Sequence, residues 1–185
     1  RDLFLGIGGV RDSGEIKFGH MREPFSIEGG TSANSFAFME RSAVNTLDPA
    51  RNWGLGYNRC GAEENWTGSV GVFQSGTDAS DVQFGDGSTT AVTARWTQLA
   101  YNVNRGERLM HFGLAVSERV ADRGIIVVSQ RPRSPLLTLG DSTDSSFVPK
   151  VQIPANFQQL INTQWAVVNG PVWAQAEWYG TIIER

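Results

Sequence analysis

Five basic side chains are the strongest candidates for chemistry in this sequence, because each could attract an anion. They are Lys17, Arg22, Arg41, Arg95 and Arg119. An anion that leaves water for a narrow passage needs fixed positive charge to offset its lost hydration. Only two of the 16 basic residues are lysines, and the planar guanidinium of arginine suits contact with phosphate or carboxylate. The pattern indicates anion binding, although arginine-rich codon usage or salt bridges to neighbouring glutamates would also explain it.

These side chains must be positioned by strands, which the sequence predicts through its alternation of apolar and polar residues. Segment after segment alternates with period two, and turn-type residues separate the segments, which is typical of antiparallel hairpins. In the hairpin around 101–108, Arg95 and Arg119 fall on the polar face. Lys17 does the same if its neighbours Ile16 and Phe18 point the other way. The apolar face of the hairpin carries Val92, Ala94, Trp96, Met110, Phe112, Leu114 and Val116.

The last hairpin is the clearest one in the sequence. Asn169-Gly170 is a favoured two-residue type I′ turn, which would join strands at 162–168 and 171–183. Such a turn places Val167 opposite Val172 and gives the hairpin one mostly apolar face and one mostly polar face.

Further strands are expected at 3–10, 15–25, 53–59, 66–74, 125–131 and 147–153, with polar loops at 77–89 and 140–146. About ten strands result, so we expect a single all-β domain over residues 1–185. No apolar run is long enough for a spanning helix, whereas a spanning β-strand needs only about 10 alternating residues. Alternation alone leaves two folds open: a membrane barrel, or a soluble β-sandwich whose exposed aromatic side chains bind carbohydrate.

Composition argues against several other classes of function. A net charge of -3 disfavours general nucleic-acid binding. Cys60 is the only cysteine, so it can form neither an intrachain disulfide nor a cysteine-based zinc site. His20 and His111 lie far apart without a supporting ligand pattern, and the adjacent glutamates at 63–64 are better explained as solvated loop residues than as a catalytic pair. We therefore expect no enzyme, no metal site and no cofactor.

One segment joins a strand-like run to a glycine-containing loop that carries paired charges and three phenylalanines: GHMREPFSIEGGTSANSFAFMERS, residues 19–42. Its motifs Arg22-Glu23-Pro24-Phe25-Ser26 and Phe38-Met39-Glu40-Arg41-Ser42 resemble, in this order, the signature of the phosphate-selective porin O and P family. The similarity continues along nearly the whole chain through Thr93-Ala94-Arg95, His111-Phe112-Gly113, Arg131-Pro132 and Asn169-Gly170-Pro171.

The resemblance implies a fold and a setting. The antiparallel meander of hairpins would be part of a 16-stranded transmembrane β-barrel, of which this chain would hold roughly the middle half. The barrel would lie in outer-membrane lipid of a Gram-negative-type bacterium, as a homotrimer.

The resemblance also implies a function: a water-filled channel for passive diffusion of small solutes, in particular anions such as phosphate. A loop in this region narrows the pore in the family, which here corresponds to residues 30–51. Arg22 and Arg41 bracket the glycine-containing loop of the 19–42 segment. Their neighbours Glu23 and Glu40 could serve as structural partners that hold the loop against the wall.

Overall fold

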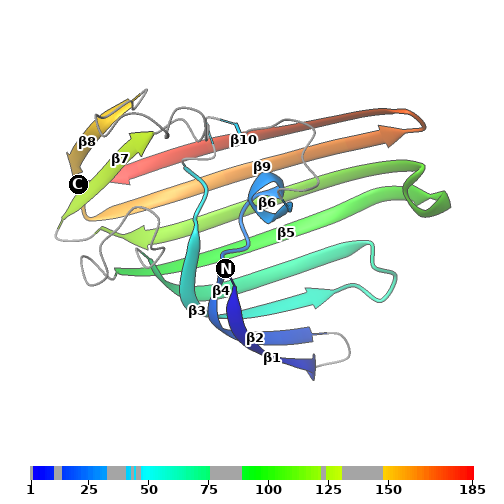
Figure 1. Ribbon diagram of the computed structural model, residues 1–185, viewed down its shortest axis with the longest axis horizontal. Coiled ribbons are helices and arrows are strands. Elements are labelled where there is room, and N and C mark those ends of the chain that lie inside the picture. Colours follow the sequence, from blue (N-terminus) through cyan, green and yellow to red (C-terminus); the bar gives the residue numbers. More distant parts are fainter. Residues whose placement is uncertain are drawn as a thin grey trace, which may run out of the picture.

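The computed structural model describes residues 2–10, 14–32, 41–42, 44, 47–75, 89–121, 124–130 and 148–185. Strands dominate these residues, as the alternation predicts (Figure 1). The helical pieces are α1 (Ile27–Gly30) and the 3₁₀ turn η3 (Asn104–Gly106). The strands are β1 (Leu3–Val10), β2 (Gly14–Arg22), β3 (Arg51–Cys60), β4 (Trp66–Ser75), β5 (Thr89–Val103), β6 (Arg108–Val120), β7 (Ile125–Gln130), β8 (Val148–Pro154), β9 (Phe157–Asn169) and β10 (Val172–Glu184).

Eight strands form one antiparallel sheet in the order β1-β2-β3-β4-β5-β6-β9-β10, which confirms the predicted meander of hairpins. Strands β7 and β8 pair with each other as a separate hairpin between β6 and β9 in the chain. This hairpin lies at the end of the sheet where β6 ends and β9 begins (Figure 1).

The connections of the large sheet differ in length at its two ends. Short connections at one end join β1 to β2, β3 to β4, β5 to β6 and β9 to β10, and of these 61–65, 104–107 and 170–171 are described. The connections at the other end are much longer and span 23–50, 76–88 and 121–156. Of these, 23–50 carries α1 and is the one that matters for the site.

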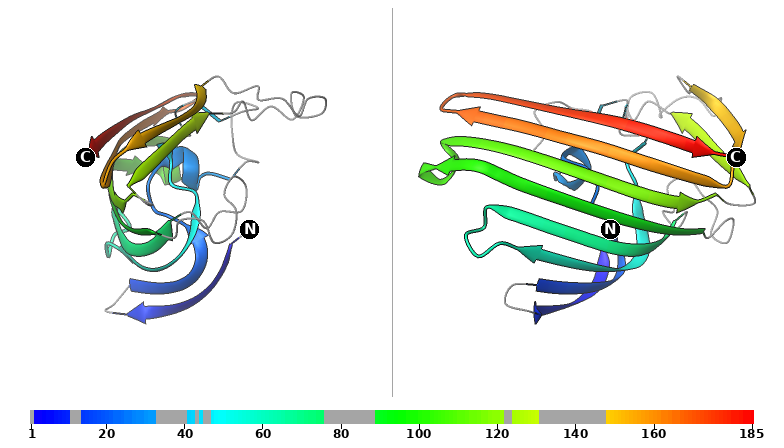
Figure 2. Two further views of the ribbon diagram at one scale, coloured as in Figure 1. Left: turned by 90° about the vertical axis from the view of Figure 1, so that its left-hand side faces the viewer. Right: turned by 180° about the vertical axis from the view of Figure 1, so that it is seen from behind.

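The large sheet is strongly curved, and α1 lies on its concave side (Figure 2). The convex face carries the predicted apolar side chains, which are 40–48% exposed at Val92, Trp96, Phe112, Leu114 and Val116. The concave face carries buried polar side chains, among them Thr93, Thr97, Ser117, Asn162 and Gln164. The predicted sidedness of these strands is therefore confirmed.

A soluble sandwich would bury the apolar face under a second sheet. Within the described parts of the chain, nothing packs on the convex face, and Val172 and Phe112 are exposed there. The residues buried between the sheet and the 23–50 connection form only a small apolar cluster around Phe25, Ala115 and Leu160. The sandwich alternative is therefore not supported.

The last hairpin differs from the expected register. Asn169 pairs with Val172, so Gly170 and Pro171 are the loop residues, and Val167 lies opposite a residue two positions further along than predicted. Pro171 explains the difference. In the expected register, residue 171 would close the hairpin by donating a backbone hydrogen bond, and proline has no N–H to donate. Gly170 supplies the positive φ of 59° that begins the turn. A shift of two residues preserves the faces.

Strand β2 is also shorter than predicted. It ends at Arg22, whereas the alternation extends the strand to Phe25. Pro24 cannot continue the ladder, and the chain turns onto the concave side instead. The expected loop at 77–89 lies outside the described residues except for Thr89, which begins β5. The expected loop at 140–146 and the motif residues Phe38, Met39, Glu40, Arg131 and Pro132 lie outside them too. No helix among those described is long and apolar enough to cross a membrane.

Candidate functional site

The 23–50 connection folds back along the concave face and places α1 against the wall formed by β5, β6, β9 and β10 (Figures 1 and 2). Ser26 is the N-cap of α1, and its Oγ accepts a hydrogen bond from the Gly29 N–H at 2.7 Å. A single helical turn is not stable by itself. Its position must therefore come from contacts with the wall and with the rest of the connection.

Asp48 is the first of three carboxylates that hold this connection in place. The Ser26 hydroxyl donates to Asp48 Oδ1 at 2.8 Å, and Arg22 Nη1 lies 3.2 Å from Asp48 Oδ2. The carboxylate packs so closely on α1 that a Cβ added at Gly29 would lie 2.1 Å from Asp48 Oδ2. Glycine at 29 is therefore required by the close approach of the carboxylate.

Burial raises the pKa of Asp48 to about 6, partly offset by the Ser26 hydrogen bond and by Arg22. Because the pKa is higher in the folded protein, Asp48 stabilises the fold most when it is protonated. This contribution is complete below the usual carboxyl pKa of about 4 and is lost as the pH rises through about 6.

Because of Asp48, we therefore expect the free energy of unfolding to be roughly 2 kcal/mol smaller at pH 8 than at pH 4. Asp48→Asn should remove that part of the pH dependence. Unfolding of the full-length protein in detergent, followed at both pH values, measures it. An Asp48→Asn variant with the pH profile of the wild type would contradict the assignment.

Glu177, on β10, is the second carboxylate. It accepts the Glu28 backbone N–H at 2.7 Å and side-chain hydrogen bonds from Asn162 at 3.2 Å and Tyr179 at 3.0 Å. On the other side of α1, Arg41 donates to the carbonyl oxygen of Glu28 at 2.7 Å. The short helix is therefore held from the wall on one side and from its own connection on the other.

Glu23 is the third carboxylate, and its side chain is fully buried. Arg119 donates to both of its oxygens, at 3.0 and 3.1 Å, and Asn52 donates to Oε1 at 2.7 Å. Thr93 also donates to this carboxylate. Glu23 thus ties the start of the connection to β3, β5 and β6, and its ionic partner is Arg119 rather than the adjacent Arg22.

Arg95 differs from Arg22 and Arg119 because its hydrogen-bond partner is a neutral side chain. Its Nε and Nη2 donate to Gln164 Oε1 at 3.2 and 2.7 Å, while Gln164 Nε2 donates to the carbonyl oxygen of Phe25 at 2.6 Å. Gly113 makes this contact possible, since a Cβ there would lie 2.6 Å from Gln164 Oε1. Arg95 has no hydrogen-bonded carboxylate among the described residues.

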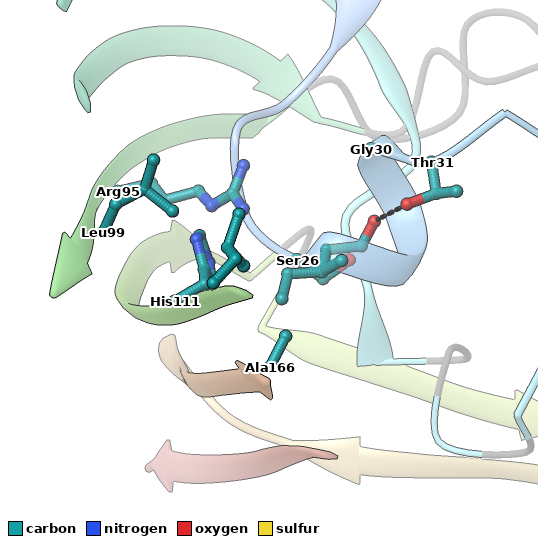
Figure 3. Close-up of a pocket in the computed structure, with 9 residues that line it drawn as sticks. Ser26, Gly30, Thr31, Arg95, Leu99, His111 and Ala166 are labelled. Atoms are coloured by element: carbon teal, nitrogen blue, oxygen red, sulfur yellow. Dashed lines mark hydrogen bonds between the residues drawn. The ribbon is translucent and has the colours of Figure 1, made fainter. Parts of the chain in front are cut away.

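A cavity of about 340 Å³ lies between α1 and the wall. Arg95 and His111 line it from the wall, and Ser26 and Thr31 line it from the α1 side. Figure 3 shows the Arg95 guanidinium beside the His111 ring, extended toward the α1 segment. His111 Nε2 is buried and has no hydrogen-bond partner in the described structure. The cavity is therefore lined by polar groups whose hydrogen-bonding capacity the protein does not fully use.

The structure brings four of the five predicted site residues together around the 23–50 connection: Arg22, Arg41, Arg95 and Arg119. Lys17 lies on β2 apart from them, with its ammonium 2.9 Å from Glu15 and over the Phe4 ring. Among the described residues, ion pairs with carboxylates are formed by Lys17, Arg22 and Arg119.

Sequence reasoning missed the residues that position the others, namely Ser26, Asp48, Gln164 and Glu177. Alternation places Gln164 and Glu177 on the polar face, and Ser26 before a short helical turn is a capping signal. Asp48 carries no comparable signal. Among the described residues, no group of three or more His, Cys, Asp or Glu side chains could hold a metal ion.

Comparison with known proteins identifies the family. The model of the family described as phosphate-selective porin O and P matches residues 1–185, the whole chain. No curated protein matches it. Porins are channel proteins of the bacterial outer membrane, and a curved antiparallel sheet with an apolar convex face and a polar concave face has the form of a porin wall. The chain belongs to the phosphate-selective porin O and P family.

Proposed function

We propose that this chain forms part of the wall of an outer-membrane channel through which small anions, such as phosphate, diffuse passively. The 30–51 loop narrows the channel, and Arg95 is the main contact for the permeating anion. The other predicted basic residues act chiefly by holding the loop and by adding to the positive potential of the lumen.

The two faces of the sheet support this proposal. Spanning strands of a barrel turn apolar side chains to lipid and polar ones to water, and the convex and concave faces divide in this way. The lengths of the connections also support the proposal, since outer-membrane barrels have short periplasmic turns and longer external loops. We accordingly assign the short turns to the periplasmic side and 23–50, 76–88 and 121–156 to the outside.

The main support for the anion role is that the charge of Arg95 is not neutralised by a hydrogen-bonded carboxylate among the described residues. A cation that contacts a carboxylate has most of its field cancelled at short range, and this applies to Arg22 and Arg119. Arg41 donates to the backbone carbonyl oxygens of Glu28 in α1 and of Thr31, which follows α1. Arg95, which lines the cavity and contacts an amide oxygen, keeps more of its charge available to a solute.

Membership of the family supports a proposal for the larger assembly. We propose that β1 and β10, the edges of the sheet, pair with further strands in a 16-stranded barrel, because unpaired backbone groups are costly in lipid. We further propose that three such barrels form a trimer surrounded by outer-membrane lipid. A trimeric band of the full-length protein on gels run without heating tests this assembly.

Arg95→Gln tests the anion role, with Arg108→Gln as its charge-matched control. Arg108 is exposed and shares the convex face with Met110 and Phe112 by alternation. One charge a few ångströms from an ion is worth about 1 kcal/mol in water and about 4 kcal/mol near a protein surface. We therefore expect Arg95→Gln to lower the anion-to-cation permeability ratio at least about fivefold.

The measurement is the zero-current potential of the full-length protein in a planar bilayer under a KCl gradient. Arg108→Gln should keep the potential of the wild type. A cation preference in the wild type that neither Arg95→Gln nor Arg41→Ala changes would refute the anion role.

A further inference from the structure

The cavity between α1 and the wall combines one guanidinium with an apolar lining. From this combination we infer that it is a binding subsite for a small organic monocarboxylate with an apolar body, such as a short fatty acid anion. This inference rests on the proposed anion channel and specifies which anion the narrowed region would bind best.

The apolar part of the cavity comes from both of its sides. Ile27 belongs to α1, Leu99 to β5, Leu109 to β6 and Ala166 to β9, and all four line the cavity. Leu99 lies opposite His111 and His111 opposite Ala166 in the sheet register, so these three side chains form one row across the wall. A hydrocarbon chain laid along this row would leave water for an apolar surface.

The polar part of the cavity fits a carboxylate head group. The guanidinium of Arg95 presents five N–H donors, and its described bonds, all to Gln164 Oε1, engage only Nε and Nη2. The remaining N–H groups are available to a carboxylate. His111 Nε2 is buried and unpaired, and in the tautomer that carries its proton on Nε2 it would donate to a ligand oxygen and so lose its desolvation penalty.

Size and charge both favour such a ligand over inorganic phosphate at this position. A cavity of about 340 Å³ holds roughly ten times the ~30 Å³ share of a water molecule in the liquid, which is more space than a phosphate ion fills. The carboxylates of Glu177 and Asp48 also act electrostatically on Arg95. Their field opposes a second negative charge, so one guanidinium here can offset a monoanion better than a dianion.

The test is block of the KCl current of the full-length protein by acetate, hexanoate and inorganic phosphate, each titrated separately. Each fully buried methylene is worth a factor of about four in affinity, and hexanoate has four more methylenes than acetate. Allowing for partial burial, we expect hexanoate to block at a concentration at least tenfold lower than acetate or phosphate. Leu109→Asn should reduce the preference for hexanoate over acetate several-fold, because it removes one of the four apolar lining side chains and leaves Arg95 in place.

The outcomes separate this inference from the proposed function. An anion-selective channel that depends on Arg95 but is blocked by phosphate more strongly than by hexanoate keeps the function and overturns the subsite. Equal block by hexanoate and acetate overturns the subsite too, and so does a hexanoate-to-acetate ratio that Leu109→Asn leaves unchanged. A channel without anion selectivity, detected by the Arg95→Gln comparison, is instead a failure of the function itself.

Discussion

Arg119→Met is expected to lower the free energy of unfolding by about 3–5 kcal/mol, the usual cost of leaving a buried charge without its partner. The Glu23 side chain has no exposed surface, and Arg119 donates to both of its oxygens. Methionine keeps much of the length and volume of the arginine stem, so the loss comes mainly from the charge. Asn52 and Thr93 would remain as neutral donors and cannot replace the guanidinium.

The heat-modifiable band shift of the full-length protein on gels gives the temperature at which the barrel opens and so measures this loss. Arg108→Met, at an exposed convex position, is the matched control and should leave that temperature nearly unchanged. The double variant Glu23→Gln with Arg119→Met should recover part of the loss, because it also removes the buried carboxylate charge that Arg119→Met alone leaves without a partner. Equal opening temperatures for Arg119→Met and Arg108→Met would show that the pair does not stabilise the wall.

Gly29→Ala is expected to release α1 from the wall and to raise the single-channel conductance, while Gly30→Ala should not. A Cβ at Gly29 meets Asp48 Oδ2 at 2.1 Å and Ser26 Oγ at 2.5 Å, and these atoms are held by each other and by Arg22. At Gly30 the added Cβ has no atom within 4 Å. Alanine also favours the helix at both sites to the same extent, so the pair isolates the clash.

Conductance in a planar bilayer at high salt is the readout, since high salt screens charge and leaves width as the main variable. A several-fold gain for Gly29→Ala alone is the expected result. A gain of equal size in both variants would mean that conductance follows helix propensity rather than the docking of the loop. If neither variant changes the conductance, the loop does not narrow the channel.

The strands and their faces were predictable because period-two alternation is a local signal. Trp96 and Phe112 on one side, and Thr93 and Ser117 on the other, follow from their own neighbours in sequence. The register of the last hairpin was not predicted correctly, because Asn169-Gly170 is a strong turn signal that Pro171 overrides.

The candidate site was less predictable, because its contacts join distant parts of the chain. Residue types alone singled out Arg95 and Arg119, yet Arg119 binds Glu23 across 96 residues, and Gln164 binds the Phe25 carbonyl across 139. The sequence next to Arg119 gives no sign of Glu23. Only the curvature of the sheet, which brings the 23–50 connection against β6 and β9, decides which cation is neutralised and which remains available.

The central claim is that the concave face borders water and the convex face borders lipid. Its most direct test compares Ala166→Cys, which lines the cavity, with Leu114→Cys, which is 48% exposed on the convex face. Both are made in a Cys60→Ser background of the full-length protein and treated in a planar bilayer with an anionic, membrane-impermeant methanethiosulfonate. We predict that the reagent reduces the current of Ala166→Cys and leaves that of Leu114→Cys unchanged. Modification of Leu114→Cys with no effect at Ala166→Cys would place water on the convex face and contradict the account.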